Sequence, residues 1–336
     1  MNILVTMPRG HVRESFIPNN IAKQLESLGK VTWNHKTEQF KTEEFREKLM
    51  DADVCITGWG CPKFDKQVLE DNNKLRLVAH TGGSVGAIMS DYLFEKNIKV
   101  ISGNYLYAES VAESAIAYML SSLRNIPFYS SEMNAGRWWS NDSPSEGLFE
   151  QRVGLVGFGL IAKEVVKMLK PFRNEILVYD PYIKKDDLAL YKEYAVKEST
   201  LKEIFSTCKI ISLHTALTPE TQKMINKELL ELIPEGAILI NTARGKLIDE
   251  SVLELELQKD RFKAALDVFE EEPLPETSKL RGLNNVILMP HKGGPTVDRR
   301  KHVTAALIID IVNFFNNKPM KNEITFQYAS TMTRKL

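Results

Sequence analysis

Two open α/β domains, each built on a doubly wound parallel sheet, are the fold class that this sequence predicts. Short apolar runs of strand length alternate with amphipathic stretches of helix length almost throughout the chain. This alternation favours parallel strands covered by helices on both faces. In the second half the runs are almost continuously apolar, as is typical of strands buried on two sides. The length of 336 residues corresponds to two domains at roughly 150 residues each.

The first third of the chain contains five apolar runs of strand length with helical patterns between them. Strands are expected at Ile3–Met7, Val31–Trp33, Val54–Thr57, Leu75–His80 and Lys99–Ser102. Helices are expected at Ile21–Leu28, Glu43–Leu49, Lys66–Asn72 and Asp91–Lys96. A longer helix is predicted from Glu109 to Asn125, with apolar residues at helical spacing and Pro127 as its stop.

The second part of the chain contains six more runs of strand length. They are Arg152–Val156, Ile176–Tyr179, Ile210–His214, Ala237–Asn241, Ala264–Val268 and Val286–Met289. A last helix is expected from Asp298 to Phe315, with apolar residues that can pack on two sides. The chain is therefore expected to cross between domains near residues 103–110 and again near 295.

The charge balance and the cysteines exclude several classes of function. Lys plus Arg and Asp plus Glu both number 44, so the formal net charge is zero. General nucleic-acid binding depends on a basic excess, so it is not predicted. The cysteines Cys55, Cys61 and Cys208 have no C-x-x-C spacing. Free buried thiols are expected in place of disulfides or a metal site.

The first residues and the hydropathy predict a cytoplasmic protein. Met1–Thr6 is strand-like, with no basic segment followed by a long apolar one, so no secretory signal is expected. No apolar run approaches the roughly 18 residues that a membrane span needs.

The sharpest local motif follows the strand at 152–156. Gly157, Gly159 and Ala162 form a G-x-G-x-x-[G/A] pattern that opens a helix expected over Glu164–Leu169. Such a turn lets backbone approach a pyrophosphate, which the helix N-terminus then attracts. The next strand ends in Asp180, where a carboxylate can bind both ribose hydroxyls and repel a 2′-phosphate. The pattern predicts NAD rather than NADP, although methyltransferases share the loop.

Three chemically suited side chains follow this motif. Arg244 comes after the strand at 237–241, and its planar guanidinium can hold a carboxylate with two bonds. His291 ends another strand before a flexible Gly-Gly, where it can carry a proton near neutral pH. Glu272 can hydrogen-bond the imidazole, fix its tautomer and favour its charged form. Together they predict a carboxylate clamp with an acid–base pair.

These residues resemble the D-isomer-specific 2-hydroxyacid dehydrogenase family, which includes phosphoglycerate, glycerate and formate dehydrogenases. The similarity covers nearly the whole chain. Besides the glycine loop, it comprises Glu109–Glu113, His214–Thr221, Asn241–Gly245, Asp267–Phe269 with Glu272–Pro273, and Pro290–His291.

The resemblance implies the domains and the site residues. A Rossmann NAD-binding domain is expected over 104–295, and a flavodoxin-like substrate domain over 1–103 plus 296–336, in a homodimer. Arg244, Glu272 and His291 would be catalytic, and Gly83 and Ser84 would share the substrate with Arg244 and His291. The implied cofactor-binding residues are Gly157, Phe158, Gly159, Leu160, Ile161, Asp180, His214, Thr215, Thr242, Ala243 and Asp267.

Three segments depart from the family pattern. Leu160 stands where many relatives carry an arginine, Gly82–Ala87 lacks the usual Asp-Asn, and Gly103–Leu106 replaces an N-x-P motif. These departures bear on the identity of the substrate more than on the type of reaction.

Aromatic residues are expected to line the substrate pocket, which favours a substrate larger than glyoxylate. They lie near His80, Tyr105, Tyr107 and the Trp138–Trp139 pair.

The predicted reaction is reversible hydride transfer between NAD(H) and C2 of a small-molecule substrate, which is a D-2-hydroxy acid or 2-oxo acid. The alternative is an NAD(H)-sensing binding protein or corepressor-like member of the same fold. A methyltransferase would explain the glycine loop and Asp180, but it gives no role to Arg244, Glu272 and His291 together.

Overall fold

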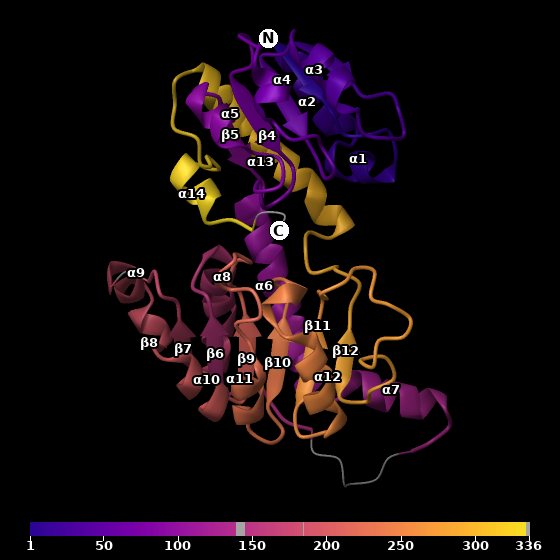
Figure 1. Cartoon of the computed structure of the whole chain (residues 1–336), viewed down its shortest axis with the longest axis vertical. Helices are drawn as coiled ribbons and strands as arrows, with labels where there is room; N and C mark the ends of the chain where they lie inside the picture. Colours follow the sequence, from indigo (N-terminus) through magenta and orange to yellow (C-terminus); the bar gives the residue numbers. More distant parts are fainter. Residues whose placement is uncertain (139–144, 184, 334–336) are drawn as a thin grey trace. The chain divides into compact units, whose positions relative to one another are not determined.

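The structure, a computed structural model, describes residues 1–138, 145–183 and 185–333. Two compact units divide the chain: unit 1 comprises Met1–Ala108 and Pro295–Leu336, and unit 2 comprises Glu109–Gly294. Figure 1 shows a strand layer with helices in each unit. The predicted fold class of two parallel α/β sheets is therefore confirmed.

The five strands of unit 1 form a parallel sheet in the order β2-β1-β3-β4-β5. The strands are β1 Asn2–Val5, β2 Lys30–Trp33, β3 Val54–Thr57, β4 Leu77–His80 and β5 Lys99–Ser102. This order is the flavodoxin-like one. Because side chains alternate along a strand, Ile3 and Val5 enter one core cluster and Leu4 enters the other.

Helices cover both faces of the unit 1 sheet. They are α1 His11–Phe16, α2 Asn19–Leu28, α3 Thr42–Leu49, α4 Lys66–Leu69, α5 Asp91–Glu95, α13 Val297–Phe315 and α14 Phe326–Ser330. In α13, Val303, Leu307 and Ile311 form one buried stripe, whereas Ile309 is exposed. The helix thus buries one face rather than the two that were expected.

Unit 2 contains a seven-stranded parallel sheet in the order β12-β11-β10-β9-β6-β7-β8. Its strands are β6 Arg152–Val156, β7 Glu175–Tyr179, β8 Val196–Glu198, β9 Ile210–Leu213, β10 Ile238–Asn241, β11 Lys263–Leu266 and β12 Val286–Leu288. Around β6 the order reverses, as in the Rossmann fold. The edge strand β8 was not predicted, because its exposed Lys197 and Glu198 leave no apolar run to detect.

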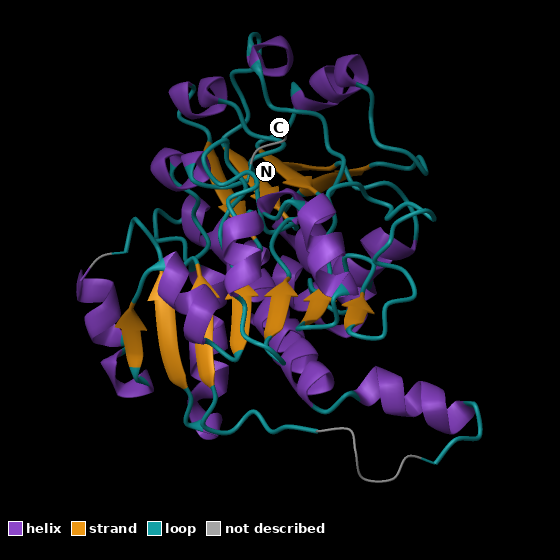
Figure 2. Cartoon of the chain, turned by 60° about the horizontal axis from the view of Figure 1, so that its bottom comes forward, coloured by secondary structure: helices purple, strands orange, loops and turns teal. Residues whose placement is uncertain are grey.

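The helices of unit 2 also lie on both faces of its sheet (Figure 2). They are α6 Asn104–Leu123, α7 Ile126–Asn134, α8 Leu160–Leu169, α9 Lys185–Leu190, α10 Leu201–Thr207, α11 Lys227–Leu232 and α12 Glu250–Gln258. Short 3₁₀ turns occur at Lys170–Phe172, Lys192–Tyr194 and Gly245–Leu247. One core cluster joins α6 and α8 to the sheet, and another joins α10, α11 and α12 to it.

The first crossing of the chain lies inside α6. This helix begins at Asn104, before the predicted start at Glu109. Leu106 and Tyr107, in its first two turns, pack against the core of unit 1. The division of the units falls after Ala108, within the crossing expected near residues 103–110.

Pro127 opens a helix instead of ending one. Helix α6 ends at Leu123, and Asn125 takes a left-handed φ of 52° before α7 begins. Proline suits the first turn of a helix because its missing N–H has no partner to lose there. None of the nine residues of α7 is buried.

Three further expectations from the sequence concern the cysteines, membrane spans and the tryptophan pair. Cys55, Cys61 and Cys208 are free and buried, as predicted. In the part of the chain that the structure describes, no helix combines the length and apolar character of a membrane span. Of the tryptophan pair, Trp138 is exposed and Trp139 lies outside the described residues.

Candidate active site

Three loops at one edge of the unit 2 sheet carry Arg244, Glu272 and His291. Arg244 follows β10, Glu272 lies in the connection after β11, and His291 follows β12. These strands are neighbours in the sheet and run parallel. Their carboxyl ends therefore meet at one edge, which is where open α/β sheets bind ligands.

A hydrogen bond joins the imidazole of His291 to the carboxylate of Glu272. The Nδ1–Oε2 distance is 2.7 Å, and the other carboxylate oxygen accepts the backbone N–H of Phe269 at 3.1 Å. Because a carboxylate only accepts, Nδ1 is the donor, and Nε2 is the nitrogen that can exchange a proton. The imidazole is half exposed, with 51% of its side chain accessible. The structure thus brings together the predicted acid–base pair.

Arg244 lies on a turn that packs directly against the segment leading to Glu272. A Cβ added to Gly245 would fall 1.8 Å from the carbonyl carbon of Phe269, so this close approach requires glycine. The side chain of Asn241 closes the turn, since it donates to the Arg244 carbonyl and accepts the Ala243 N–H. Gly245 was not predicted as a site residue, because it contacts a segment that lies further along the chain. Asn241 was not predicted either, although its bonds are local.

Burial lowers the pKa of the Arg244 guanidinium, and the nearby charge of Glu272 acts in the opposite direction. Its Nη1 donates to the Ala243 carbonyl at 2.5 Å. The pKa of an arginine stays far above neutrality, so the group remains charged. A permanently charged, partly buried guanidinium beside a carboxylate–imidazole pair is suited to hold a carboxylate ligand.

Asp267 fixes the loop that carries His291. The carboxylate is buried, and it accepts the N–H groups of Lys292 and Gly293, both at 2.7 Å. Burial raises the pKa of Asp267, and these two N–H groups act against that rise. His291 itself has a left-handed φ of 53°, a costly conformation for a residue with a side chain. The bonds from Asp267 help to hold the loop in this conformation.

The glycine loop after β6 has the geometry that a dinucleotide needs. Gly157 has a φ of +94°, and a Cβ there would lie 2.7 Å from the backbone nitrogen of Thr215. Gly159 faces open space and precedes α8, whose first turn has no side-chain cap. Leu160 and Ile161 begin that helix, and within the described residues no side chain accepts a hydrogen bond from their N–H groups. An anion at this helix start would be stabilised by the free N–H groups.

Asp180 lies beside the glycine loop, as the sequence predicts. Its Oδ2 accepts the N–H of Phe158 at 2.7 Å, and its Oδ1 accepts that of Tyr182 at 2.9 Å. Each carboxylate oxygen has a second lone pair, so these bonds leave capacity for ribose hydroxyls.

Unsatisfied polar atoms surround the same sheet edge. Both ring nitrogens of His214 and the hydroxyl of Thr242 are buried without a hydrogen-bond partner among the described residues. Burial lowers the pKa of His214 to about 4, so this imidazole is neutral at pH 7. An unsatisfied buried polar atom costs about 1–3 kcal/mol, which a ligand can recover. Thr215 and Ala243 adjoin these two residues, so the predicted residues of unit 2 fit a bound dinucleotide.

In unit 1, Gly83 and Ser84 offer two consecutive backbone donors after β4. Within the part of the chain that the structure describes, neither N–H donates to another group. The Ser84 hydroxyl accepts the N–H of Gly86 at 3.3 Å, which holds the turn. The aromatic ring of Tyr107 packs over Gly83.

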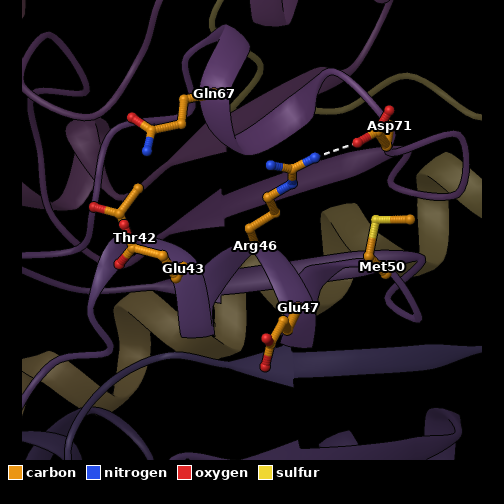
Figure 3. A pocket seen from close by; sticks show the side chains of 7 residues that line it. All are labelled: Thr42, Glu43, Arg46, Glu47, Met50, Gln67 and Asp71. Carbon is orange, nitrogen blue, oxygen red and sulfur yellow. Dashed lines mark hydrogen bonds and ion pairs between the residues drawn. The ribbon is translucent and has the colours of Figure 1, made fainter.

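A surface hollow of about 410 Å³ lies elsewhere in unit 1, beside α3 and α4 (Figure 3). Arg46 and Asp71 form an ion pair across it, which neutralises its arginine. The lining residues are Thr42, Glu43, Arg46, Glu47, Met50, Gln67 and Asp71. No predicted site residue is among them.

The family described as "D-isomer specific 2-hydroxyacid dehydrogenase, NAD binding domain" matches residues 116–293. The chain belongs to this family. Its NAD-binding domain thus corresponds to unit 2, and the cofactor of the family is NAD(P). Membership supports the dehydrogenase interpretation and does not support the sensor alternative.

Two relatives of this chain are similar over most of its length. D-3-phosphoglycerate dehydrogenase of Methanocaldococcus jannaschii is 35% identical over 302 residues, which cover 90% of this chain and 55% of the relative. The chain therefore spans about half the length of that relative. Hydroxypyruvate reductase of Thermotoga maritima is 32% identical over 81% of this chain and 88% of its own length.

A solved structure, that of a D-2-hydroxyisocaproate dehydrogenase, has the same fold. Its TM-score is 0.80 at 22% identity, with 97% of this chain and all of that chain covered. At this identity the similarity concerns the fold.

Replacing Asp267 by asparagine is expected to destabilise unit 2. Asparagine has one acceptor oxygen, so either the Lys292 or the Gly293 N–H loses its partner, at a cost of about 1–3 kcal/mol. Urea unfolding of Asp267→Asn should show a lower free energy of unfolding than wild type. Tyr118→Phe is the control, since it removes only the long 3.4 Å bond to the same carboxylate. Equal stability of Asp267→Asn and wild type would show that these bonds do not fix the loop.

Proposed function

We propose that this chain is an NAD-dependent D-2-hydroxyacid dehydrogenase that transfers hydride reversibly between NAD(H) and C2 of a 2-oxo acid. The observation that carries the proposal is the bonded His291–Glu272 pair beside Arg244, at the sheet edge that also presents the glycine loop. Family membership supports the same reaction class.

The residues of unit 2 that would hold the cofactor lie at this edge of the sheet. Gly157, Phe158, Gly159, Leu160 and Ile161 would face the pyrophosphate, and Asp180 the adenosine ribose. His214, Thr215, Thr242, Ala243 and Asp267 would line the remainder. The bound cofactor supplies or accepts the hydride. The carboxylate of Asp180 would repel a 2′-phosphate, which favours NAD over NADP.

The side chains of the chain have separate tasks in this reaction. Arg244 binds the substrate carboxylate and polarises the carbonyl at C2, and the N–H groups of Gly83 and Ser84 also bind the carboxylate. His291 gives a proton from Nε2 to the carbonyl oxygen when hydride reaches C2. In the reverse direction Nε2 removes the hydroxyl proton. Glu272 keeps Nδ1 protonated and stabilises the charged imidazole that this exchange requires.

The assembly that fits this fold is a cytoplasmic homodimer. Buried free thiols suit a reducing compartment. Helix α7 buries none of its residues, and it carries the exposed side chains of Ile126 and Met133. Figures 1 and 2 show α7 at the end of unit 2 where the strands begin, away from the loops that follow the strands. A second copy of the chain would cover this helix.

The activity test follows NADH absorbance with 2-oxo acids from glyoxylate to phenylpyruvate, in parallel with NADPH. Wild type should use at least one acid and prefer NADH. His291→Ala removes the proton donor, so kcat/KM should fall by about 10²–10⁴-fold. Binding of NADH, measured by fluorescence titration, should remain near the wild-type value.

The control for this substitution is His302→Ala, which removes another exposed imidazole. It should keep wild-type turnover. Wild-type turnover in both His291→Ala and Arg244→Ala would show that the site assignment is wrong.

The dimer is tested at α7 by light scattering coupled to size exclusion. Wild type should have the mass of two chains, twice 38.2 kDa. Met133→Glu places a charge on the exposed face of α7 and should shift the mass toward one chain, because an unpaired charge in an interface is costly. Leu255→Glu, at an exposed position of α12, is the matched control. A wild-type monomer would contradict the proposal.

A further inference from the structure

Unit 1 contains an aromatic–arginine cluster beside the Gly83 turn. We define it as Phe16, Trp59, Tyr107 and Arg300. The guanidinium carbon of Arg300 lies 5.4 Å from the ring centroid of Phe16 and 5.6 Å from that of Trp59. The rings of Trp59 and Tyr107 meet edge to face at 6.5 Å. The cluster thus extends from Arg300 to the ring of Tyr107, which contacts the Gly83 turn.

Arg300 has neutral partners only. Its Nε donates to the carbonyl of Pro295 at 3.2 Å, and its Nη1 donates to the hydroxyl of Ser15 at 3.3 Å. It forms no ion pair with a carboxylate of the described residues. The side chain is partly buried. A charge that is withdrawn from water without a counter-charge is costly, and an anionic ligand would offset that cost.

Tyr107 adds a donor that has no partner among the described residues. Its hydroxyl is buried and has no hydrogen-bond partner in the part of the chain described. Burial raises the pKa of Tyr107, and the charge of Arg300 acts in the opposite direction. The phenol therefore stays protonated at neutral pH and can donate a hydrogen bond. The unpaired phenol and the charged guanidinium therefore both suit a negatively charged acceptor.

Trp59 gives the cluster an accessible apolar side. Half of this tryptophan is exposed, although its ring packs against both Phe16 and Tyr107. Exposed tryptophan next to a guanidinium provides a flat wall along which the carbon chain of a ligand can lie. These contacts all belong to unit 1, which also carries the Gly83 and Ser84 donors.

We propose that Arg300 and Tyr107 select substrates with a second anionic group, a carboxylate or a phosphate distant from C2. This inference rests on the proposed function, in which Gly83 and Ser84 bind the carboxylate next to C2. A guanidinium binds carboxylate and phosphate alike through charge-assisted bonds. Trp59 contacts the carbon chain between the two ends.

The test compares pairs of acids that differ only at the distal end. Oxaloacetate is paired with the neutral-ended 2-oxoisocaproate, and phosphohydroxypyruvate with hydroxypyruvate. Wild type should favour the dianion in at least one pair, and the favoured pair distinguishes carboxylate from phosphate. Arg300→Gln should reduce kcat/KM for that dianion by about 10–100-fold, mainly through KM, and leave its neutral-ended partner nearly unchanged.

Two further variants keep the result independent of folding. Arg300→Lys keeps a charge and should retain part of the preference. Tyr107→Phe keeps the ring on Gly83 and should lower the preference several-fold without lowering the melting temperature, because the hydroxyl has no partner to lose. Lys301→Gln, at an exposed position on the same helix, is the control.

An equal loss on both members of each pair would overturn the proposal, since it would place Arg300 on the carboxylate that all the acids share. So would a wild type that prefers the neutral-ended acids. Failure of every acid to react would contradict the proposed function instead. Calorimetric titration with oxaloacetate and phosphohydroxypyruvate then tests the cluster directly, and wild-type protein that binds neither dianion would refute it.

Discussion

The hydrogen bond between His291 Nδ1 and Glu272 Oε2 is the interaction on which the proposed chemistry of unit 2 depends. Neither partner is positioned by its own strand alone. Glu272 is oriented by the hydrogen bond that its carboxylate accepts from the Phe269 N–H, and the segment before Glu272 packs against Gly245. His291 sits in a left-handed conformation that the bonds of Asp267 to the following residues help to maintain. Backbone contacts thus help, as much as side-chain contacts, to fix the position of the imidazole whose Nε2 would exchange the proton.

In each unit the candidate binding groups lie where the parallel strands of its sheet end. In unit 2 this edge combines a helix start that suits an anion, buried polar atoms without partners and a charged guanidinium. In unit 1 it combines the Gly83 and Ser84 donors with the aromatic–arginine cluster. Most of the buried side-chain atoms without a partner among the described residues belong to groups that can donate a hydrogen bond. An enzyme whose substrate is an acid and whose cofactor carries phosphates needs such donors.

The fold could be predicted because buried parallel strands are apolar for their whole length. The edge strand β8 lacks that property, and α7 was missed because Pro127 marks a helix start as readily as a stop. Arg244, Glu272 and His291 could be proposed as a site because each residue type suits one task and each lies in a loop that follows a strand. The contacts of Gly245 and Arg300 could not be predicted. They join segments up to hundreds of residues apart, as in the bond between Arg300 and Ser15, and no local pattern encodes such contacts.

The central claim is that C2 of a 2-oxo acid receives hydride from NADH and that the carbonyl oxygen receives a proton from His291. The most direct measurement uses NADH that carries deuterium at both C4 positions of the dihydronicotinamide, with analysis of the 2-hydroxy acid by chiral chromatography and mass spectrometry. The account predicts a product of the D configuration that carries deuterium at C2, formed by wild type and lost in His291→Ala. A product of the L configuration, or one without deuterium at C2, would contradict it.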